Sequence, residues 1–300
     1  MMRQAFLYLS TRKGMRKWME TSPVARKMTR RFIAGLTLED ELAVCADLAA
    51  RKTFATLDHL GENVKSLAEA EASRDAYLSA LDEIAKRGLP CTVSIKLTQF
   101  GLDLSNDACF QNVLALADRA TANGTRIEID MESTAYTDRT LAIVEKIGSA
   151  RAVIQAYLYR SAADIARLNE LKIPVRLCKG AYNEPASAAF PGKSDVDRSF
   201  LKLMKSLLDK GTYPAIASHD ETILGEAFRY AREREIAPEN FEFQMLYGIR
   251  TDLQQRIIDL GYRLRVYVPY GEAWYPYFMR RLAERPANVL FLAKNFFEGS

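Results

Sequence analysis

Histidine and cysteine are scarce in this chain, and their scarcity narrows the chemistry that it can perform. The 300 residues include two histidines, His59 and His219, and four cysteines that form no CxxC motif. Clusters of these residues at fixed spacing are the usual ligands of zinc and iron, so no metal centre is expected. The scattered cysteines predict free thiols in a reducing cytosol.

Long apolar runs and an excess of charge of one sign are also missing. No run approaches the about 20 apolar residues that cross a bilayer, and the N-terminus lacks a secretory signal. Lys and Arg number 42 against 38 Asp and Glu. This near balance argues against a nucleic-acid-binding protein, which would concentrate basic residues on one face. We therefore expect a cytoplasmic protein without nucleic-acid partners.

What the chain does contain is a regular alternation of two patterns. Short β-rich runs predict strands at 53–57, 92–95, 126–130, 152–156, 175–178, 213–217, 241–245 and 264–268. Helical patterns follow them at 64–87, 107–122, 138–147, 161–171, 195–210, 220–235, 252–260 and 273–284. Eight strands alternating with eight helices predict an α/β fold of the TIM-like (β/α)8 barrel type. We expect one domain over 1–300, with N-terminal helices in 1–50 and the barrel in 51–300.

Helix starts are predicted from residues that cap helices with a side-chain oxygen. The predicted N-caps are Thr37, Ser105, Ser161, Asp195 and Thr251.

Polar residues lie at the C-terminal ends of most of the predicted strands or in the loops that follow, where the active sites of such barrels lie. They are Lys96, Asp130, Glu132, Gln155, Arg176, Lys179, Ser218, His219, Asp220 and Tyr267. Each has a structural alternative. Lys96 and Asp130 could form an ion pair that only closes the barrel interior. His219 could be a structural histidine bonded to Asp220 or to the backbone, and Lys179-Gly180 a simple turn.

The last predicted helix carries a cationic face. Tyr277, Arg280, Arg281 and Glu284 stand at i, i+3, i+4 and i+7, so they share one side of the helix. Two neighbouring guanidinium groups suit a carboxylate or phosphate ligand. The alternative is a solvated helix face with Arg–Glu pairs.

The order of these residues along the chain resembles that in proline dehydrogenases, specifically the short single-function bacterial kind. Nine segments carry the resemblance: Leu60-Gly-Glu62, Ser94-Ile-Lys-Leu-Thr98, Glu128-Ile-Asp-Met-Glu132, Gln155-Ala-Tyr157, Arg176-Leu-Cys-Lys-Gly-Ala-Tyr182, Ala217-Ser-His-Asp220, Gln244-Met-Leu-Tyr-Gly248, Arg265-Val-Tyr-Val-Pro269 and Tyr277-Phe-Met-Arg-Arg-Leu-Ala-Glu-Arg-Pro286. They cover the chain from about residue 30.

The resemblance implies a distorted (β/α)8 barrel whose eighth helix lies over the mouth. It implies non-covalent FAD and oxidation of L-proline to Δ1-pyrroline-5-carboxylate, the first step of proline catabolism to glutamate, by hydride transfer from proline C5 to flavin N5. The electrons would pass to a membrane quinone, which implies peripheral contact with the cytoplasmic face of the inner membrane. The basic stretch Arg12-Lys-Gly-Met-Arg-Lys-Trp18 either touches lipid or is a solvated helix end.

Roles for individual residues come from the same resemblance. Asp130 and Arg176 match catalytic positions. The substrate-binding positions are Lys96, Tyr182, Leu246, Tyr267, Arg280 and Arg281. The cofactor-binding positions are Met131, Gln155, Arg176, Cys178, Lys179, Gly180, Ser218 and His219. Glu62 matches the acid that pairs with Arg281 when the pocket closes, and Glu284 a residue that orders the arginine helix. Cys178 and Ser218 replace the valine and threonine that are commoner in the family.

Two other functions are compatible with the sequence. One is oxidation of 4-hydroxyproline or another cyclic amino acid, against which the Tyr267 phenol argues because it leaves little room for a ring hydroxyl. The other is a non-catalytic barrel that binds an anion.

Overall fold

Eight parallel strands form the centre of the molecule. The structure, a computed structural model, describes residues 29–284, with side chains as far as residue 279. The strands are β1 (Phe54–His59), β2 (Cys91–Ile95), β3 (Ile127–Ile129), β4 (Arg151–Gln155), β5 (Val175–Cys178), β6 (Ala215–Ala217), β7 (Glu242–Leu246) and β8 (Leu264–Tyr270). They pair in sequence order, and β8 pairs with β1 to close the barrel. The predicted (β/α)8 fold is confirmed.

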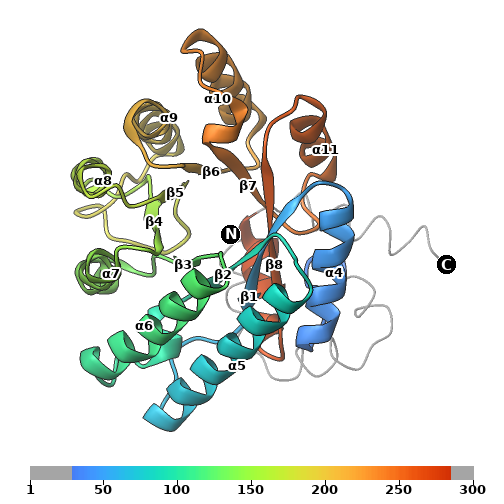
Figure 1. Cartoon of the computed structure of the whole chain (residues 1–300). Helices are drawn as coiled ribbons and strands as arrows, with labels where there is room; N and C mark the ends of the chain where they lie inside the picture. Colours follow the sequence, from blue (N-terminus) through green and yellow to red (C-terminus); the bar gives the residue numbers. More distant parts are fainter. Residues whose placement is uncertain (1–28, 285–300) are drawn as a thin grey trace, which may run out of the picture.

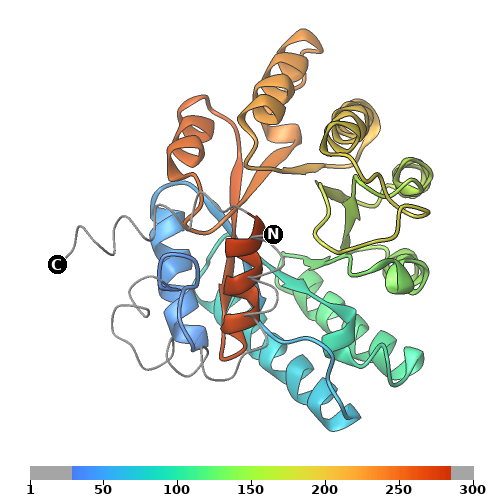
Figure 2. The same ribbon diagram turned by 180° about the vertical axis from the view of Figure 1, so that it is seen from behind.

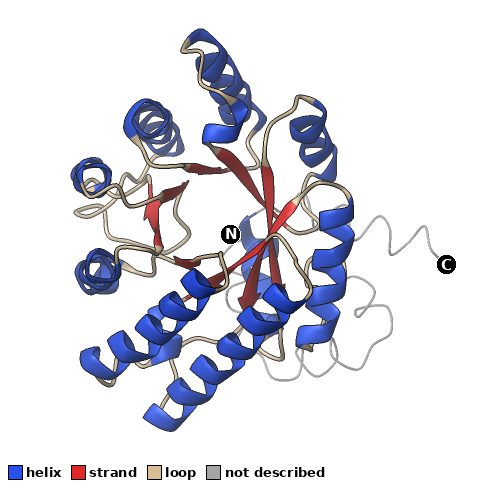
Figure 3. Cartoon of the chain, in the orientation of Figure 1, coloured by secondary structure: helices blue, strands red, loops and turns tan. Residues whose placement is uncertain are grey.

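Helices surround this barrel on the outside, except the last one, which lies over one end (Figure 1, Figure 3). They are α4 (Leu38–Ala50), α5 (Leu67–Lys86), α6 (Asn106–Ala122), α7 (Thr134–Ile147), α8 (Ser161–Glu170), α9 (Lys193–Lys210), α10 (Glu221–Glu233), α11 (Thr251–Asp259) and α12 (Trp274–Glu284). Two short 3-10 helices, Leu97–Phe100 and Pro238–Asn240, lie in the loops. The other helices predicted in the first 50 residues, and the segment Arg12–Trp18, lie outside the described residues.

Each strand divides its side chains between two environments. One set, including Leu57, Val93, Ile129 and Val266, is apolar and joins the large core between strands and helices. The other set faces the barrel interior and is mostly polar, although Ala215 of β6 also belongs to it. Arg151 of β4 reaches Glu242 of β7 across this interior. Period-two alternation of this kind is the expected result when a strand has two different faces. The lumen of this barrel is therefore filled by polar side chains.

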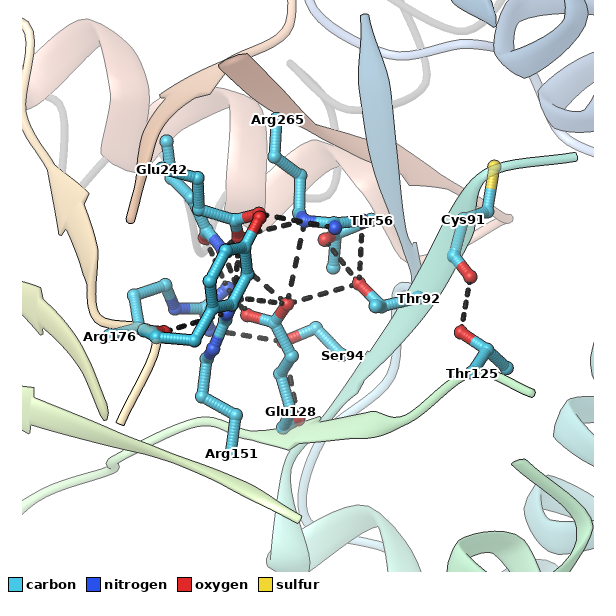
Figure 4. A network of polar contacts seen from close by, with 12 residues as sticks. Thr56, Cys91, Thr92, Ser94, Thr125, Glu128, Arg151, Arg176, Glu242 and Arg265 are labelled. Carbon is cyan, nitrogen blue, oxygen red and sulfur yellow. Dashed lines mark hydrogen bonds and ion pairs between the residues drawn. The ribbon is translucent and has the colours of Figure 1, made fainter. Parts of the chain in front are cut away.

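A buried ion network occupies the half of the lumen nearer the amino ends of the strands (Figure 4). Arg151 is fully buried and contacts Glu128 at 3.0 Å and Glu242 at 2.5 Å. Arg265 contacts Glu242 at 2.9 Å. Charges buried this deeply are tolerated because each one contacts more than one group of opposite charge. Removal of one partner lowers the free energy of unfolding by about 3–5 kcal/mol. The network thus fixes the strands on which the mouth residues stand.

The last helix lies over the mouth of the barrel (Figure 2). Its aromatic residues Trp274, Tyr275 and Phe278 pack in one cluster with Leu60 after β1 and Ile249 after β7. Both of these loops follow the carboxyl ends of strands, so α12 covers that end, as the resemblance implied.

The predicted helix starts are partly wrong. Thr37 and Ser105 cap α4 and α6 with their side chains, as predicted. Ser161 instead is the first residue of α8, and its hydroxyl donates to the Gln155 carbonyl at 2.6 Å. Helix α9 begins two residues before Asp195, with Gly192 as its N-cap, and Thr251 is the first residue of α11. In the described part of the chain, no helix combines the length and the apolar character needed to cross a bilayer.

Candidate active site

Lys96 lies between two carboxylates at the mouth of the barrel. It follows β2, and its ammonium is 3.3 Å from Asp58 Oδ1 at the end of β1 and 3.2 Å from Asp130 Oδ2 after β3. Lys96 Nζ also lies 3.4 Å from the hydroxyl of Tyr267 on β8. The Tyr267 hydroxyl in turn donates to Asp130 Oδ2 at 2.9 Å. Four strand ends therefore bring one cation, two anions and a phenol together.

Arg176 of β5 completes this group from the other side of Asp130. Its guanidinium pairs with Asp130 Oδ1 and donates to the Ser94 hydroxyl at 3.1 Å. It also contacts Glu128 at 3.1 Å, and its Cζ lies 5.3 Å from the centre of the Tyr267 ring. The polar group at the mouth is therefore continuous with the buried ion network deeper in the lumen, because Glu128 contacts residues of both (Figure 4).

The charges of these groups follow from burial and from their neighbours. Burial disfavours the Lys96 ammonium, but Asp58 and Asp130 outweigh this effect and raise the pKa of Lys96 well above its usual value. Burial would raise the pKa of Asp130, but Arg176 and Lys96 hold the pKa below its usual value. At neutral pH, Lys96 is thus a cation and Asp130 an anion.

The pKa values of Tyr267 and Asp58 both shift upward, in the direction that burial favours. Burial, with Asp130 nearby, raises the pKa of Tyr267 well above its usual value, so the phenol stays protonated and can donate. Burial also raises the pKa of Asp58, and Lys96 only partly offsets it. Asp58 is 1% exposed.

Gln155 is held in one orientation at the end of β4. Its amide nitrogen donates to the Glu132 carbonyl at 2.9 Å, and its amide oxygen accepts from the Ala181 N–H at 3.4 Å. The Glu132 carboxylate accepts from the Thr98 hydroxyl at 2.7 Å. Met131, between Asp130 and Glu132, is buried. The amide thus links the segment after β3 to the loop after β5.

The loop after β5 requires glycine at position 180. Gly180 has φ of +115°, which other residues rarely adopt, and a side chain there would overlap the Tyr157 ring. The neighbouring Lys179 ammonium contacts Asp197 at 2.6 Å and Asp220 at 2.9 Å. Lys179 therefore binds two carboxylates of the protein, and the Cys178–Gly180 segment offers a ligand mainly its backbone. The Cys178 thiol donates to the Ile154 carbonyl at 3.6 Å.

Ser218 and His219 contact the protein in ways that support β7. His219 Nε2 accepts from the Leu246 N–H at 2.8 Å, so this nitrogen carries no proton. The Ser218 hydroxyl accepts from the Asp220 N–H at 3.1 Å. Of the alternatives for His219, the bond to the backbone is present, and it positions Leu246 at the rim of the mouth.

Glu62 and Tyr182 come from two different loops but belong to the same electrostatic environment. Burial, followed by the carboxylates Glu62 and Glu132, raises the pKa of Tyr182. Both Tyr182 and Glu62 are half-buried. Arg280, Arg281 and Glu284 belong to α12, whose backbone covers the mouth, but their side chains lie outside the described part of the structure.

Asp58 was missed by the reasoning from sequence. The predicted first strand ended at Leu57, whereas β1 continues to His59 and directs Asp58 into the lumen. The available signal was the pattern of β1 itself: Thr56 and Asp58 share one face, and Thr56 lies in the lumen beside Thr92 at 2.6 Å.

Comparison with known proteins agrees with this geometry. The family model described as proline dehydrogenase matches residues 42–294. The chain is 42% identical to proline dehydrogenase 1 of Bacillus subtilis, over 98% of each chain. It is 37% identical to proline dehydrogenase of Deinococcus radiodurans, over 91% of each chain. A crystal structure of proline utilization A from Bdellovibrio bacteriovorus, inactivated by N-propargylglycine, aligns with TM-score 0.82 and 27% identity. That alignment covers 92% of this chain and 34% of the longer protein. The chain belongs to the proline dehydrogenase family, in its single-function form.

Proposed function

We propose that this chain oxidises L-proline to Δ1-pyrroline-5-carboxylate with FAD and passes the electrons to a membrane quinone. The observation that carries the proposal is the group at the mouth formed by the half-buried Lys96, Asp130 and Tyr267 with the buried Arg176. Family membership and the names of the relatives support proline as the substrate. We also propose that the whole chain is one catalytic domain, which works at the cytoplasmic face of the membrane.

On the substrate side, the proposal assigns the proline carboxylate to Lys96 together with Arg280 and Arg281. Charge-assisted bonds from three cations would fix the ring and convert binding energy into orientation. Tyr267 and Leu246 would form walls of the pocket, and Tyr182 would cover it. Glu62 would pair with Arg281 on closure, and Glu284 would order the arginine helix.

The residues at the mouth fit a flavin. FAD supplies the hydride acceptor when it is bound. Arg176 is a buried cation, Gln155 presents an oriented amide, and the glycine turn at Gly180 exposes backbone. Met131, Cys178, Lys179, Ser218 and His219 complete the proposed cofactor positions. Asp130 would hold Arg176 and Tyr267 in place, and the cations would favour the neutral amine of proline, which is the form that donates hydride.

The decisive experiment is optical. Purified protein should be yellow, and its flavin band should bleach on addition of proline without oxygen. Heat-released flavin should be FAD, and a short-chain quinone should restore the band. A colourless protein that cannot be reconstituted with FAD would support the anion-binding barrel instead.

The same preparation tests the substrate. Tyr267 lies within the polar group and leaves little room for a ring hydroxyl. We expect kcat/KM for L-proline to exceed that for 4-hydroxyproline. Equal or better turnover of 4-hydroxyproline would reverse this assignment. Vesicle co-sedimentation of the full chain and of a chain lacking Arg12–Trp18 tests the membrane contact, since equal pelleting would exclude that segment.

A further inference from the structure

Both ends of the loop between β5 and α9 are attached to the loop after β4. At its start, the Tyr157 N–H donates to the Lys179 carbonyl at 3.0 Å. Near its end, the Phe190 N–H donates to the Tyr157 carbonyl at 2.8 Å, and Leu158 and Ala189 form an antiparallel bridge. Between these attachments, residues 181–187 form an arch at the mouth.

The Ala181 N–H and the Ala186 carbonyl tie the arch to Gln155 and to the Tyr159 hydroxyl. A contact of Glu184 ties it to helix α7. Glu184 Oε1 accepts from the Thr134 N–H at 2.9 Å, and Glu184 Oε2 accepts from the Thr134 hydroxyl at 2.5 Å. Thr134 is the first residue of α7, and its N-cap Ser133 makes no side-chain capping bond. Glu184 therefore caps α7 from a position 50 residues further along the chain. A carboxylate is the favoured partner there, because the N-terminus of a helix presents unpaired N–H groups and positive potential.

This contact joins two segments that both serve the proposed pocket. Helix α7 starts directly after Asp130, Met131 and Glu132, so Thr134 moves with that segment. Glu184 stands two residues after Tyr182, so its bonds to Thr134 fix the arch close to the Tyr182 side chain. The body of the arch is otherwise exposed at Ala181, Asn183 and Pro185. Exposed backbone with few buried contacts is where local opening is least costly.

We propose that Glu184 is a positioning residue, which locks the arch to α7 so that Tyr182 stands over the substrate pocket. This inference rests on the proposed function, because it takes Tyr182 as the cover of the proline site. Without the bonds between Glu184 and Thr134, the arch populates several positions, and only a fraction of the molecules is competent to bind proline. The apparent dissociation constant rises as the inverse of that fraction, while the chemical step in a correctly closed molecule is unchanged.

The test compares kinetic constants of the full-length, FAD-loaded enzyme. We expect Glu184→Ala to raise KM for proline about tenfold, with kcat changed by less than about twofold. Glu184→Gln retains an acceptor oxygen without the charge, so its KM should lie between. Thr134→Val keeps the N–H but removes the hydroxyl, and should raise KM about threefold. In the Glu184→Ala background, Thr134→Val should have no further effect.

The control is Glu69→Gln. Glu69 also accepts a backbone N–H near the start of a helix at the mouth end, from Lys65 at 2.8 Å, but this bond does not involve the arch. It should leave KM unchanged. Cleavage of the arch by a nonspecific protease should be faster in Glu184→Ala than in Glu69→Gln.

Three results would overturn the inference: KM of Glu184→Ala within twofold of the parent, additive effects of the two substitutions, or a fall in kcat alone. A merely structural role would lower the melting temperature and leave KM unchanged. If the parent protein itself fails to oxidise proline, the proposed function fails, whereas an active parent with an unaffected Glu184→Ala variant refutes only the role of Glu184.

Discussion

Replacement of Asp58 by Asn tests whether Lys96 owes its charge to its two carboxylate partners. Burial is the largest influence on the pKa of Lys96 and lowers it, and Asp58 is the largest influence that opposes burial. At the observed 3.3 Å and an effective dielectric constant of about 20, the pair interaction is about 5 kcal/mol. Loss of this interaction lowers the pKa of Lys96, because the opposing effect of burial then meets only Asp130 and weaker neighbours.

The expected result is a pH-dependent loss of proline affinity. The Lys96 ammonium of Asp58→Asn should lose its proton at a lower pH than that of the parent, whose pKa is raised well above its usual value. A neutral amine grips a carboxylate poorly, so the ratio of KM in the variant to KM in the parent should rise from about pH 7 to about pH 10. Titration of proline itself cancels in this ratio.

Steady-state kinetics with a quinone acceptor at several pH values provides the measurement. Glu41→Gln is the matched control: Glu41 is fully buried on α4, and burial raises its pKa well above the usual value. Burial therefore favours the protonated carboxyl, so near neutral pH we expect the substitution to change no charge. A KM ratio for Asp58→Asn that stays flat with pH, in a folded flavin-bearing variant, would refute the reasoning.

Three further predictions concern the scaffold. Gly180→Ala should lower both stability and the amount of bound flavin, because the strained φ alone costs about 1–3 kcal/mol and the new methyl group overlaps the Tyr157 ring. Flavin content and urea unfolding measure the two effects. Unchanged values would show that the loop adapts to the methyl group. Arg151→Met should lower the free energy of unfolding by about 3–5 kcal/mol, because it removes the fully buried cation that Glu128 and Glu242 share and leaves the network with excess negative charge. A loss below about 1 kcal/mol in urea unfolding would contradict this. Burial would raise the pKa of Glu242, but Arg265 and Arg151 hold it well below its usual value. Its stabilising contribution is thus present above about pH 4.5 and is lost as the pH falls below that. The melting temperature should drop on acidification, and less steeply in Glu242→Gln.

Local patterns in the sequence were sufficient to predict the barrel. Strand and helix periods differ, so eight alternations are visible without knowledge of any contact. The predicted bounds of the helix at 107–122 differ from those of α6 by one residue. Strand β1 was predicted too short because Asp58 is a poor strand former by propensity. Its ion pair with Lys96, 38 residues away, overrides that propensity.

Polar partners could not be predicted in the same way. The hydroxyl of Ser161 reads as a helix cap, yet in the fold it donates to the Gln155 carbonyl. Lys179 was predicted only as a cofactor-binding position or part of a turn, and its contacts with Asp197 and Asp220 were not foreseen. Such partners are chosen by the closure of the barrel, which brings together residues distant in sequence. The pattern shows which residues are polar and near the mouth, but not the atom to which each one is bonded.

The polar lumen has a consequence for redesign of substrate preference. Asp58, Lys96, Asp130, Arg176 and Glu128 form one unbroken chain of contacts from the pocket toward the opposite end of the barrel. A mutant library that varies one pocket position at a time will therefore contain mostly variants in which a charged side chain has lost a partner of opposite charge. Combinations that exchange an acid and a base together keep the sum of charges constant. Positions far below the pocket are then legitimate targets for tuning selectivity, because they share its electrostatic balance.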